Sequence, residues 1–251
     1  MKYLTFNKSS KDAFDLNEKI EATKIDLSNP LLLQYNWVIW EQVSDNKIKQ
    51  SNNYKDYTRP LAKFNSVQKF WQLWNRLPQP SDLLTQRSMT RFSDDGIFRI
   101  VDALMIFRDN IQPMWEDPAN AGGGHFEYKI LPKDFPYSQI DEFWNNLVLA
   151  IIGCSLKHYD LITGIRLVDK LSTTRYGYIR IEIWYTTITD ENVRNHLRKD
   201  LEEHMCNRID GSHVYPPRVK SLSHVHKIRI TLEFIYNPYY LFLWVFIFFF
   251  F

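Results

Sequence analysis

The sequence has little cysteine, with only Cys154 and Cys206 among its 251 residues. Two cysteines exclude a disulfide-rich scaffold and a four-cysteine zinc site, and they fit a reducing compartment, so we expect a cytoplasmic protein. The first fifteen residues interleave lysine with aspartate and contain no apolar run, so we expect no secretory signal. A surplus of one charge is also lacking, since 31 Lys and Arg face 29 Asp and Glu, which excludes wrapping of nucleic acid by the whole surface.

Aromatic residues are abundant, at 16% of the chain, and the 45% apolar content predicts a folded domain with its own core. Residues 1–28 mix charges without a hydrophobic period, which is typical of a tail, and we assign the domain to residues 29–236. Residues 237–251 form an apolar C-terminal tail. Its run of 13 residues from Tyr239 to Phe251 is shorter than the ~17–25 residues that span a bilayer, so we expect no membrane contact.

The apolar periods predict an α+β fold. Helical spacing marks three segments, which are residues 65–77, 138–153 and 190–207. Asn65 and Ser138 are the expected N-caps of the first two helices, and Pro78 ends the first. Alternation predicts five strands, which are residues 36–43, 126–130, 164–168, 178–186 and 227–234. Because each strand is apolar on one face only, we expect helices on one side of an antiparallel sheet and an open second side.

In two of the predicted strands, the alternation shows to which face of the strand each tryptophan points. In the fourth strand the odd positions form an apolar face, so Trp184 shares the open face with Arg180. An indole there either covers a neighbour or faces a ligand. Trp37 and Trp40 lie an odd number of steps apart in the first strand, so they point to opposite faces and only one of them can be core.

The segment MWEDPANAGGGHFEY places Trp115 directly before Glu116, in a loop whose backbone is restricted by Pro113 and Pro118. A rigid loop, an aromatic ring and an adjacent carboxylate are typical of a binding site. With the stretches QYNWVIWEQ, SVQKFWQLWN and FWNNLVLAIIG in the right order, this motif resembles the cap-binding translation initiation factor 4E family over about residues 29–230.

The resemblance implies a curved antiparallel sheet with three helices on its convex face and an open concave face that binds the 7-methylguanosine cap of messenger RNA. The methylated base is a cation, so two aromatic rings that sandwich it gain stacking and a cation–π attraction. The implied rings are Trp115 and Tyr54, with Tyr57 as the alternative to Tyr54. Glu116 is implied to accept hydrogen bonds from the guanine N1 and N2 donors, and Trp184 to abut the methyl group.

The triphosphate of a cap needs cations, and Arg166, Lys170, Arg175 and Arg180 lie close together in the sequence. The resemblance assigns the phosphate contacts to the last three of these. His125 stands where many members of the family have an arginine, and an imidazole there would make this phosphate contact depend on pH.

The resemblance also implies a second site on the helical side, for a partner helix from an initiation factor 4G-type scaffold or a 4E-binding protein. Pro30, Val67, Trp71 and Leu149 match that surface. Asn146 stands where a carboxylate is usual in the family, which implies altered partner binding.

We therefore expect a non-enzymatic cap-binding protein of translation initiation that needs no cofactor. The alternative is a repressor-type homologue that binds caps but engages the scaffold differently, as Tyr54 and Asn146 suggest. A hydrolase built on Glu116, Asp117 and His125 is the best enzymatic interpretation, but no nucleophile or activated-water motif accompanies these residues.

Three further patterns carry no predicted function. The histidines within residues 196–226 lack zinc spacing, so we expect no metal site. The three glycines at 122–124 are not followed by the Lys-Ser/Thr of a phosphate-binding loop, which predicts a flexible turn. The pattern is poor from Ser81 until the apolar run FRIVDALMIF, which begins at Phe98, and the resemblance implies that residues 84–104 are an insertion relative to the family.

Overall fold

The computed structural model describes residues 29–44, 57–86, 88–92, 98–171, 177–208 and 210–225. The predictions for Tyr54, Arg175, the strand 227–234 and the two tails lie outside the described residues.

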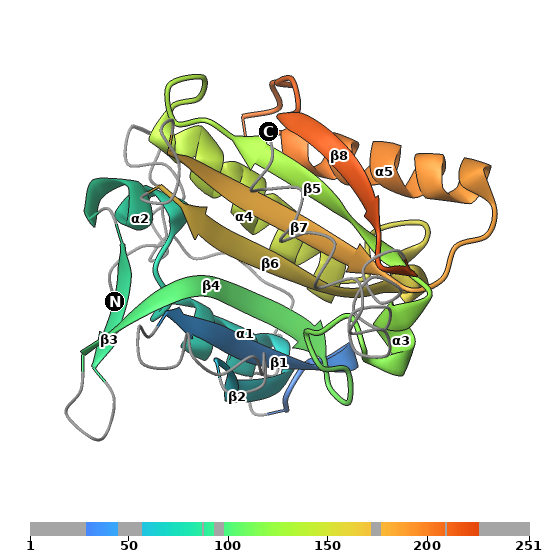
Figure 1. The fold of residues 1–251 in the computed structure, drawn as a ribbon, viewed down its shortest axis with the longest axis horizontal. Helices are drawn as coiled ribbons and strands as arrows, with labels where there is room; N and C mark the ends of the chain where they lie inside the picture. Colours follow the sequence, from blue (N-terminus) through green and yellow to red (C-terminus); the bar gives the residue numbers. More distant parts are fainter. Residues whose placement is uncertain are drawn as a thin grey trace, which may run out of the picture.

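Eight strands of the described residues form one antiparallel sheet, so the predicted α+β class is confirmed. They are β1 (Leu32–Ser44), β2 (Thr58–Ser66), β3 (Met89–Phe92), β4 (Phe98–Arg108), β5 (Gly124–Ile130), β6 (Ile162–Lys170), β7 (Tyr178–Tyr185) and β8 (Arg218–Ser223). The order across the sheet is β2-β1-β4-β6-β7-β5-β8, and β3 pairs with β4 beside this path. The sheet curves across the front of the molecule in Figure 1.

Helices cover one face of this sheet. They are α1 (Val67–Trp74), α2 (Pro80–Gln86), α4 (Tyr137–Ile152) and α5 (Glu191–Cys206), whereas the short helix α3 (Pro118–Ala121) lies in the connection between β4 and β5. α1, α4 and α5 are the three predicted helices, and Figure 1 shows α1 and α4 behind the strands. α2 is missing from the prediction because Pro80 signals a stop, although a proline at the first helical position costs no hydrogen bond. Within the described parts of the chain, none of the helices has the length and apolar content of a membrane span.

Two helices begin at residues other than the predicted ones. Ser66 caps α1, and its hydroxyl accepts a hydrogen bond from a backbone N–H of the first turn at 3.3 Å. Asn65 is the wrong cap because β2 continues to Ser66. α4 begins after Pro136, so the predicted cap Ser138 lies inside its first turn.

The segment 84–104, predicted as an insertion, reaches the middle of the sheet. It contains the end of α2, all of β3 and the first part of β4, and β4 pairs with both β1 and β6. Its alternation is hidden because β4 is apolar on both faces, with Leu104 in the core under the helices and Ala103 on the opposite side. A strand buried on both faces reads as a continuous apolar run. β2 and β8 are also missing from the prediction, because they are edge strands with few buried side chains.

Apolar side chains gather on both faces of the sheet. The main core, between sheet and helices, contains the fully buried Trp37, Trp74 and Trp144. A second cluster lies on the other face and consists of Ala103, Met105, Phe107, Val168 and Trp184, with Trp40, Ile111 and Trp115 packed against it. Trp37 and Trp40 therefore lie on opposite faces, as predicted.

Candidate functional site

The loop between β4 and α3 carries Trp115 and Glu116. Hydrogen bonds between its own backbone and the side chains of Asp117 and Asn120 hold it in place. The side-chain amide of the fully buried Asn120 donates to two carbonyl oxygens of this loop, at 3.0 and 2.9 Å. Asp117 caps α3 with one carboxylate oxygen, and the other accepts from the Gln112 N–H at 2.8 Å. The loop is thus ordered before any ligand arrives.

Trp115 and Glu116 line a hollow on the face of the sheet that is turned away from α1 and α4. Its walls are Pro113, Met114, Trp115, Glu116, Arg166 and Trp184, and it encloses about 70 Å³. Trp115 is half-buried against the second cluster, whereas Glu116 is exposed. Typical ligand pockets hold roughly 300–1,000 Å³, so these walls would cover only part of a purine base. The structure therefore brings together three of the residues predicted to bind a base, and adds Arg166.

Trp184 lies on the predicted face of β7 but is not open to solvent, since only 1% of it is exposed. Its ring packs edge-on against Phe107 and is stacked on His125, with ring centroids 5.4 and 5.6 Å apart, respectively. The ring of His224 lies 4.4 Å away. The indole N–H donates to Oε2 of Glu182 at 2.9 Å. Strand alternation predicts the face of this ring, but not the segments that cover it.

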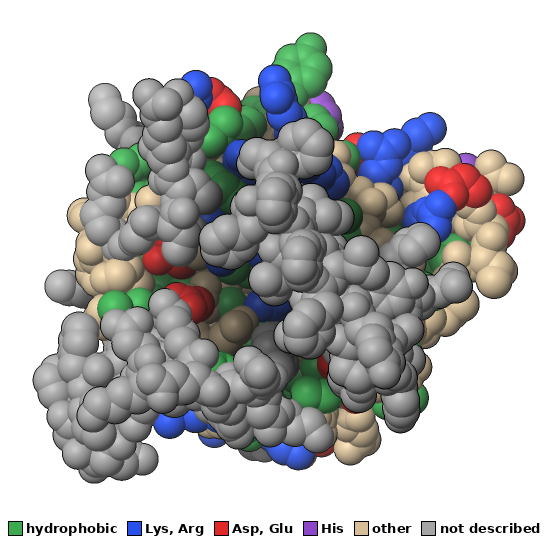
Figure 2. Space-filling view, in the orientation of Figure 1, with side chains coloured by type: hydrophobic (Ala, Val, Ile, Leu, Met, Phe, Trp, Pro, Cys, Tyr) green, Lys and Arg blue, Asp and Glu red, His purple; other side chains and the backbone are tan. Residues whose placement is uncertain are grey.

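Glu182 is the centre of an ion-pair network beside the hollow. Arg166 donates to its Oε2 at 3.0 Å, and Arg180 lies 2.7 Å from its Oε1. Arg180 also pairs with Glu127 at 3.1 Å, and Arg166 donates to Gln42 at 2.7 Å. Acidic and basic side chains lie near one another in the middle of this face in Figure 2.

The surroundings of Glu182 fix its charge. Burial alone would raise the pKa of this carboxyl group, but the positive charges of Arg166, His125 and Arg180, together with the Trp184 hydrogen bond, lower it to about 2. Glu182 is therefore ionised at neutral pH and holds two of the hollow's walls, Arg166 and Trp184.

The predicted phosphate contacts are less accessible than expected. Arg180 is held by two carboxylates, and Lys170 is half-buried at the end of β6. His125 is only 2% exposed, and its Nδ1 lies 2.9 Å from Nε2 of His224. A surface phosphate contact by His125 does not fit this geometry, because its ring is stacked on Trp184 inside the fold.

Sequence spacing did not predict one cluster of possible metal ligands. His125, Glu127 and Glu182 offer ligand atoms within 4.8 Å of one another. Arg180 bridges the two carboxylates, and Arg166 donates to one of them. These guanidinium groups already neutralise the charge that would attract a cation, so the cluster is better described as an ion-pair network.

The residues of the hydrolase interpretation do not form an acid–base group. The carboxylate of Asp117 accepts hydrogen bonds from backbone N–H groups of its own loop and of α3. The ring of His125 is bonded to His224. Glu116 alone of the three faces solvent.

Of the three glycines predicted to form a flexible turn, Gly123 and Gly124 are buried and Gly124 already belongs to β5. A Cβ atom on Gly123 would lie 2.0 Å from the carbonyl oxygen of Tyr185, and one on Gly122 would lie 2.2 Å from Oγ1 of Thr187. Glycine is required here because the end of β7 approaches the backbone closely.

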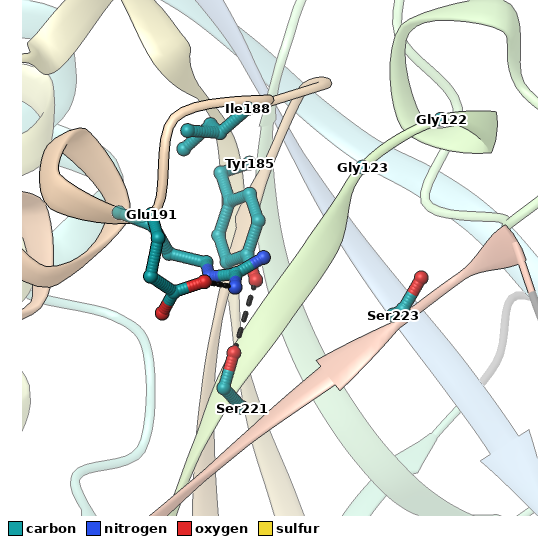
Figure 3. A pocket seen from close by; sticks show the side chains of 8 residues that line it. Gly122, Gly123, Tyr185, Ile188, Glu191, Ser221 and Ser223 are labelled. Atoms are coloured by element: carbon teal, nitrogen blue, oxygen red, sulfur yellow. Dashed lines mark hydrogen bonds and ion pairs between the residues drawn. The ribbon is translucent and has the colours of Figure 1, made fainter.

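A larger hollow, of about 370 Å³, opens between the start of α5 and β8. Figure 3 shows Tyr185, Glu191, Ser221 and Ser223 around it. Glu191 forms an ion pair with Arg194, which also lines this hollow. The hydroxyl groups of Tyr185 and Ser221 lie 3.2 Å apart, within hydrogen-bond distance. Of the described residues that line this hollow, Tyr185 alone carries a ring, so the hollow at Trp115 is the better candidate for a base.

The predicted partner residues lie on the helical side or at its margin. Pro30 is exposed, and Val67, Trp71 and Leu149 are half-buried. The side-chain amide of Asn146 donates to two carbonyl oxygens at the C-terminal end of α5, at 3.3 and 2.9 Å. Asn146 therefore ties α4 to α5, a role that the sequence pattern did not indicate.

Comparison with known proteins agrees with this architecture. The model of the family described as Eukaryotic initiation factor 4E matches residues 32–229. Eukaryotic translation initiation factor 4E of Candida glabrata is 27% identical over 176 residues, which cover 70% of this chain and 71% of that protein. The protein of the same name from Eremothecium gossypii is 29% identical over 172 residues, covering 67% of each.

A solved structure gives the same result for the fold. The complex of C. elegans eIF4E-3 with the 4E-binding protein Mextli and a cap analog matches with a TM-score of 0.57 at 19% identity. The match covers 80% of this chain and 96% of that chain.

Proposed function

Because this chain belongs to the eukaryotic initiation factor 4E family, we propose that it binds the 7-methylguanosine cap of messenger RNA and recruits a scaffold protein in translation initiation. We propose further that it acts in the cytoplasm as a binding factor and not as an enzyme. The similar worm protein is named in its solved structure with a cap analog and with a 4E-binding protein, which supports both partners.

The observation that carries the proposal is the hollow in which Trp115, Glu116 and Trp184 meet. A cationic base stacked on Trp115 gains cation–π attraction as well as stacking. Glu116 at the exposed wall would accept hydrogen bonds from the N1 and N2 donors, a contact worth about 1–3 kcal/mol of discrimination against other bases. Trp184, fixed by Glu182, would abut the methyl group.

The second ring of the sandwich is proposed to be Tyr54. Its alternative, Tyr57, is half-buried beside β1, and its carbonyl oxygen accepts from the Val43 N–H at 2.9 Å. This bond anchors Tyr57 at the base of the segment between β1 and β2. Tyr54 therefore remains our choice, with Lys170, Arg175 and Arg180 as the proposed phosphate contacts.

Tryptophan fluorescence tests the proposal directly. Titration with 7-methylguanosine triphosphate should quench the emission at lower concentration than guanosine triphosphate does. Trp115→Ala and Glu116→Gln should each remove most of this binding. Glu191→Gln is the matched control for Glu116, because it also removes an exposed carboxylate, but one at the start of α5. Equal quenching of wild-type protein by the methylated and plain nucleotides would reject cap binding.

Scaffold binding is assigned to the helical side around Trp71 and Leu149. A peptide of the initiation factor 4G type should bind the wild-type protein in calorimetry. Asn146 supplies no carboxylate, and its amide is already bonded to the end of α5, which is the observation in favour of the repressor-type alternative. Cap binding without peptide binding would favour that alternative.

A further inference from the structure

A guanidinium group lines the hollow that we assign to the methylated base. Arg166 on β6 is one of the six wall residues and is 8% exposed. Its guanidinium carbon lies 5.7 Å from the centre of the Trp184 ring. Hydrogen bonds to Glu182 and Gln42, at 3.0 and 2.7 Å, fix its orientation. Arg166 is therefore a fixed part of the wall and not a surface side chain that can swing away.

The charge of this wall acts differently on the two forms of the base. An arginine side chain stays protonated throughout the pH range of folded proteins. The methylated base is positively charged, whereas plain guanine is neutral. In a partly desolvated site, a like charge opposes binding of the methylated base and leaves the neutral base almost unaffected.

Glu182 offsets this repulsion only in part, because Arg166 and Arg180 share its carboxylate. Arg180 also forms an ion pair with a second carboxylate, that of Glu127. These four side chains together carry no net charge. Replacing Arg166 with a neutral residue would therefore remove one positive charge from the wall and leave these four positions with one net negative charge, so the methylated base would be repelled less while the neutral base would be almost unaffected.

We propose that Arg166 is a specificity-determining residue that lowers the preference of this protein for a methylated over an unmethylated guanine base. The inference rests on the proposed function of the same hollow. Glu116 acts in the opposite direction, since its carboxylate is the attractive charge at the exposed wall.

The experiment measures the ratio of the two dissociation constants, for guanosine triphosphate and 7-methylguanosine triphosphate, by fluorescence quenching. Arg166→Met should raise this ratio about tenfold, equivalent to about 1.4 kcal/mol. Arg166→Lys keeps the charge and should stay near the wild-type ratio. Arg194→Met removes a cation near the start of α5, beside the other hollow, and should leave the ratio unchanged.

A folded Arg166→Met protein whose ratio stays within twofold of wild type would overturn the inference while leaving cap binding intact. A Lys variant whose ratio rises as far as that of the Met variant would overturn it too, because its charge is retained. Circular dichroism checks the fold, and Arg166→Gln, which keeps hydrogen-bond donors, replaces the Met variant if that one does not fold. A wild-type protein that binds no methylated nucleotide would overturn the proposed function, and this inference with it.

Discussion

The buried carboxylate of Glu182 makes a prediction about stability that can be worked out from its contacts. Its two oxygens accept from the Trp184 indole and pair with Arg166 and Arg180. Glu182→Gln removes the negative charge and leaves two guanidinium groups facing a neutral amide. Removing one partner of a buried ion pair typically costs about 3–5 kcal/mol, and we expect a loss of that size at pH 7.

The pH dependence gives a second measure of the same group. The pKa of Glu182 falls from 4.5 to about 2 on folding, which corresponds to about 3 kcal/mol, since one pKa unit is worth about 1.4 kcal/mol. Because the folded pKa is the lower one, this stability is complete above pH 4.5 and is lost as the pH falls toward about 2. Glu182→Gln has no such group and should lack this part of the acid destabilisation.

Urea unfolding at pH 7 and at pH 3, followed by circular dichroism, measures both effects. Glu191→Gln is the control, because it removes a carboxylate from an exposed pair whose loss should cost at most about 1 kcal/mol. Equal unfolding free energies for wild-type protein and Glu182→Gln at pH 7 would refute the role that we give to the network.

Four further predictions follow from single residues. Gly123→Ala places a methyl group 2.0 Å from the Tyr185 carbonyl oxygen and should lower the unfolding free energy by about 3 kcal/mol or more; a neutral effect in urea unfolding would contradict the packing described. Ser66→Ala removes the cap of α1 and should cost about 1 kcal/mol, whereas Asn65→Ala should cost less than half of that in the same assay. Trp71→Ala should abolish calorimetric binding of a 4G-type peptide and keep nucleotide quenching within twofold, so loss of both would reject a separate partner surface. Lys170→Ala should weaken binding of 7-methylguanosine triphosphate and make the affinity fall less steeply with salt; an unchanged salt slope would remove Lys170 from the phosphate contacts.

Local patterns predicted much of the fold because they depend on neighbours in the sequence. The helices α1, α4 and α5 and the strands β1, β5, β6 and β7 were predicted, since a period of 3.6 or 2 is visible without tertiary contacts. β4 was missed for the opposite reason: Ile106 and Phe107 are both fully buried, so the strand shows no alternation. The edge strands β2 and β8 were missed because few of their side chains are buried.

The candidate site also has a part that local sequence patterns predicted and a part that depends on tertiary contacts. A motif around Trp115 and Glu116 indicated the family and the base-binding loop, and alternation placed Trp184 on the correct face. The sequence could not show that His125 turns inward to His224, or that Arg180 is held by two carboxylates. The contacts of His125 with His224 and of Arg180 with Glu127 join segments that are far apart in the chain, so no spacing records them, whereas Arg180 and Glu182 are two residues apart on β7.

By itself the sequence determined the fold class, the family and the loop that carries the stacking ring, because these depend on short motifs and local periods. Only the tertiary structure decided which charged side chains form ion pairs inside the fold and which line the hollow. Arg166 shows the difference most clearly: in the sequence it is one of several cations, and in the folded protein it is a wall of the site, because β6 lies beside β7 and Glu182 holds its guanidinium group.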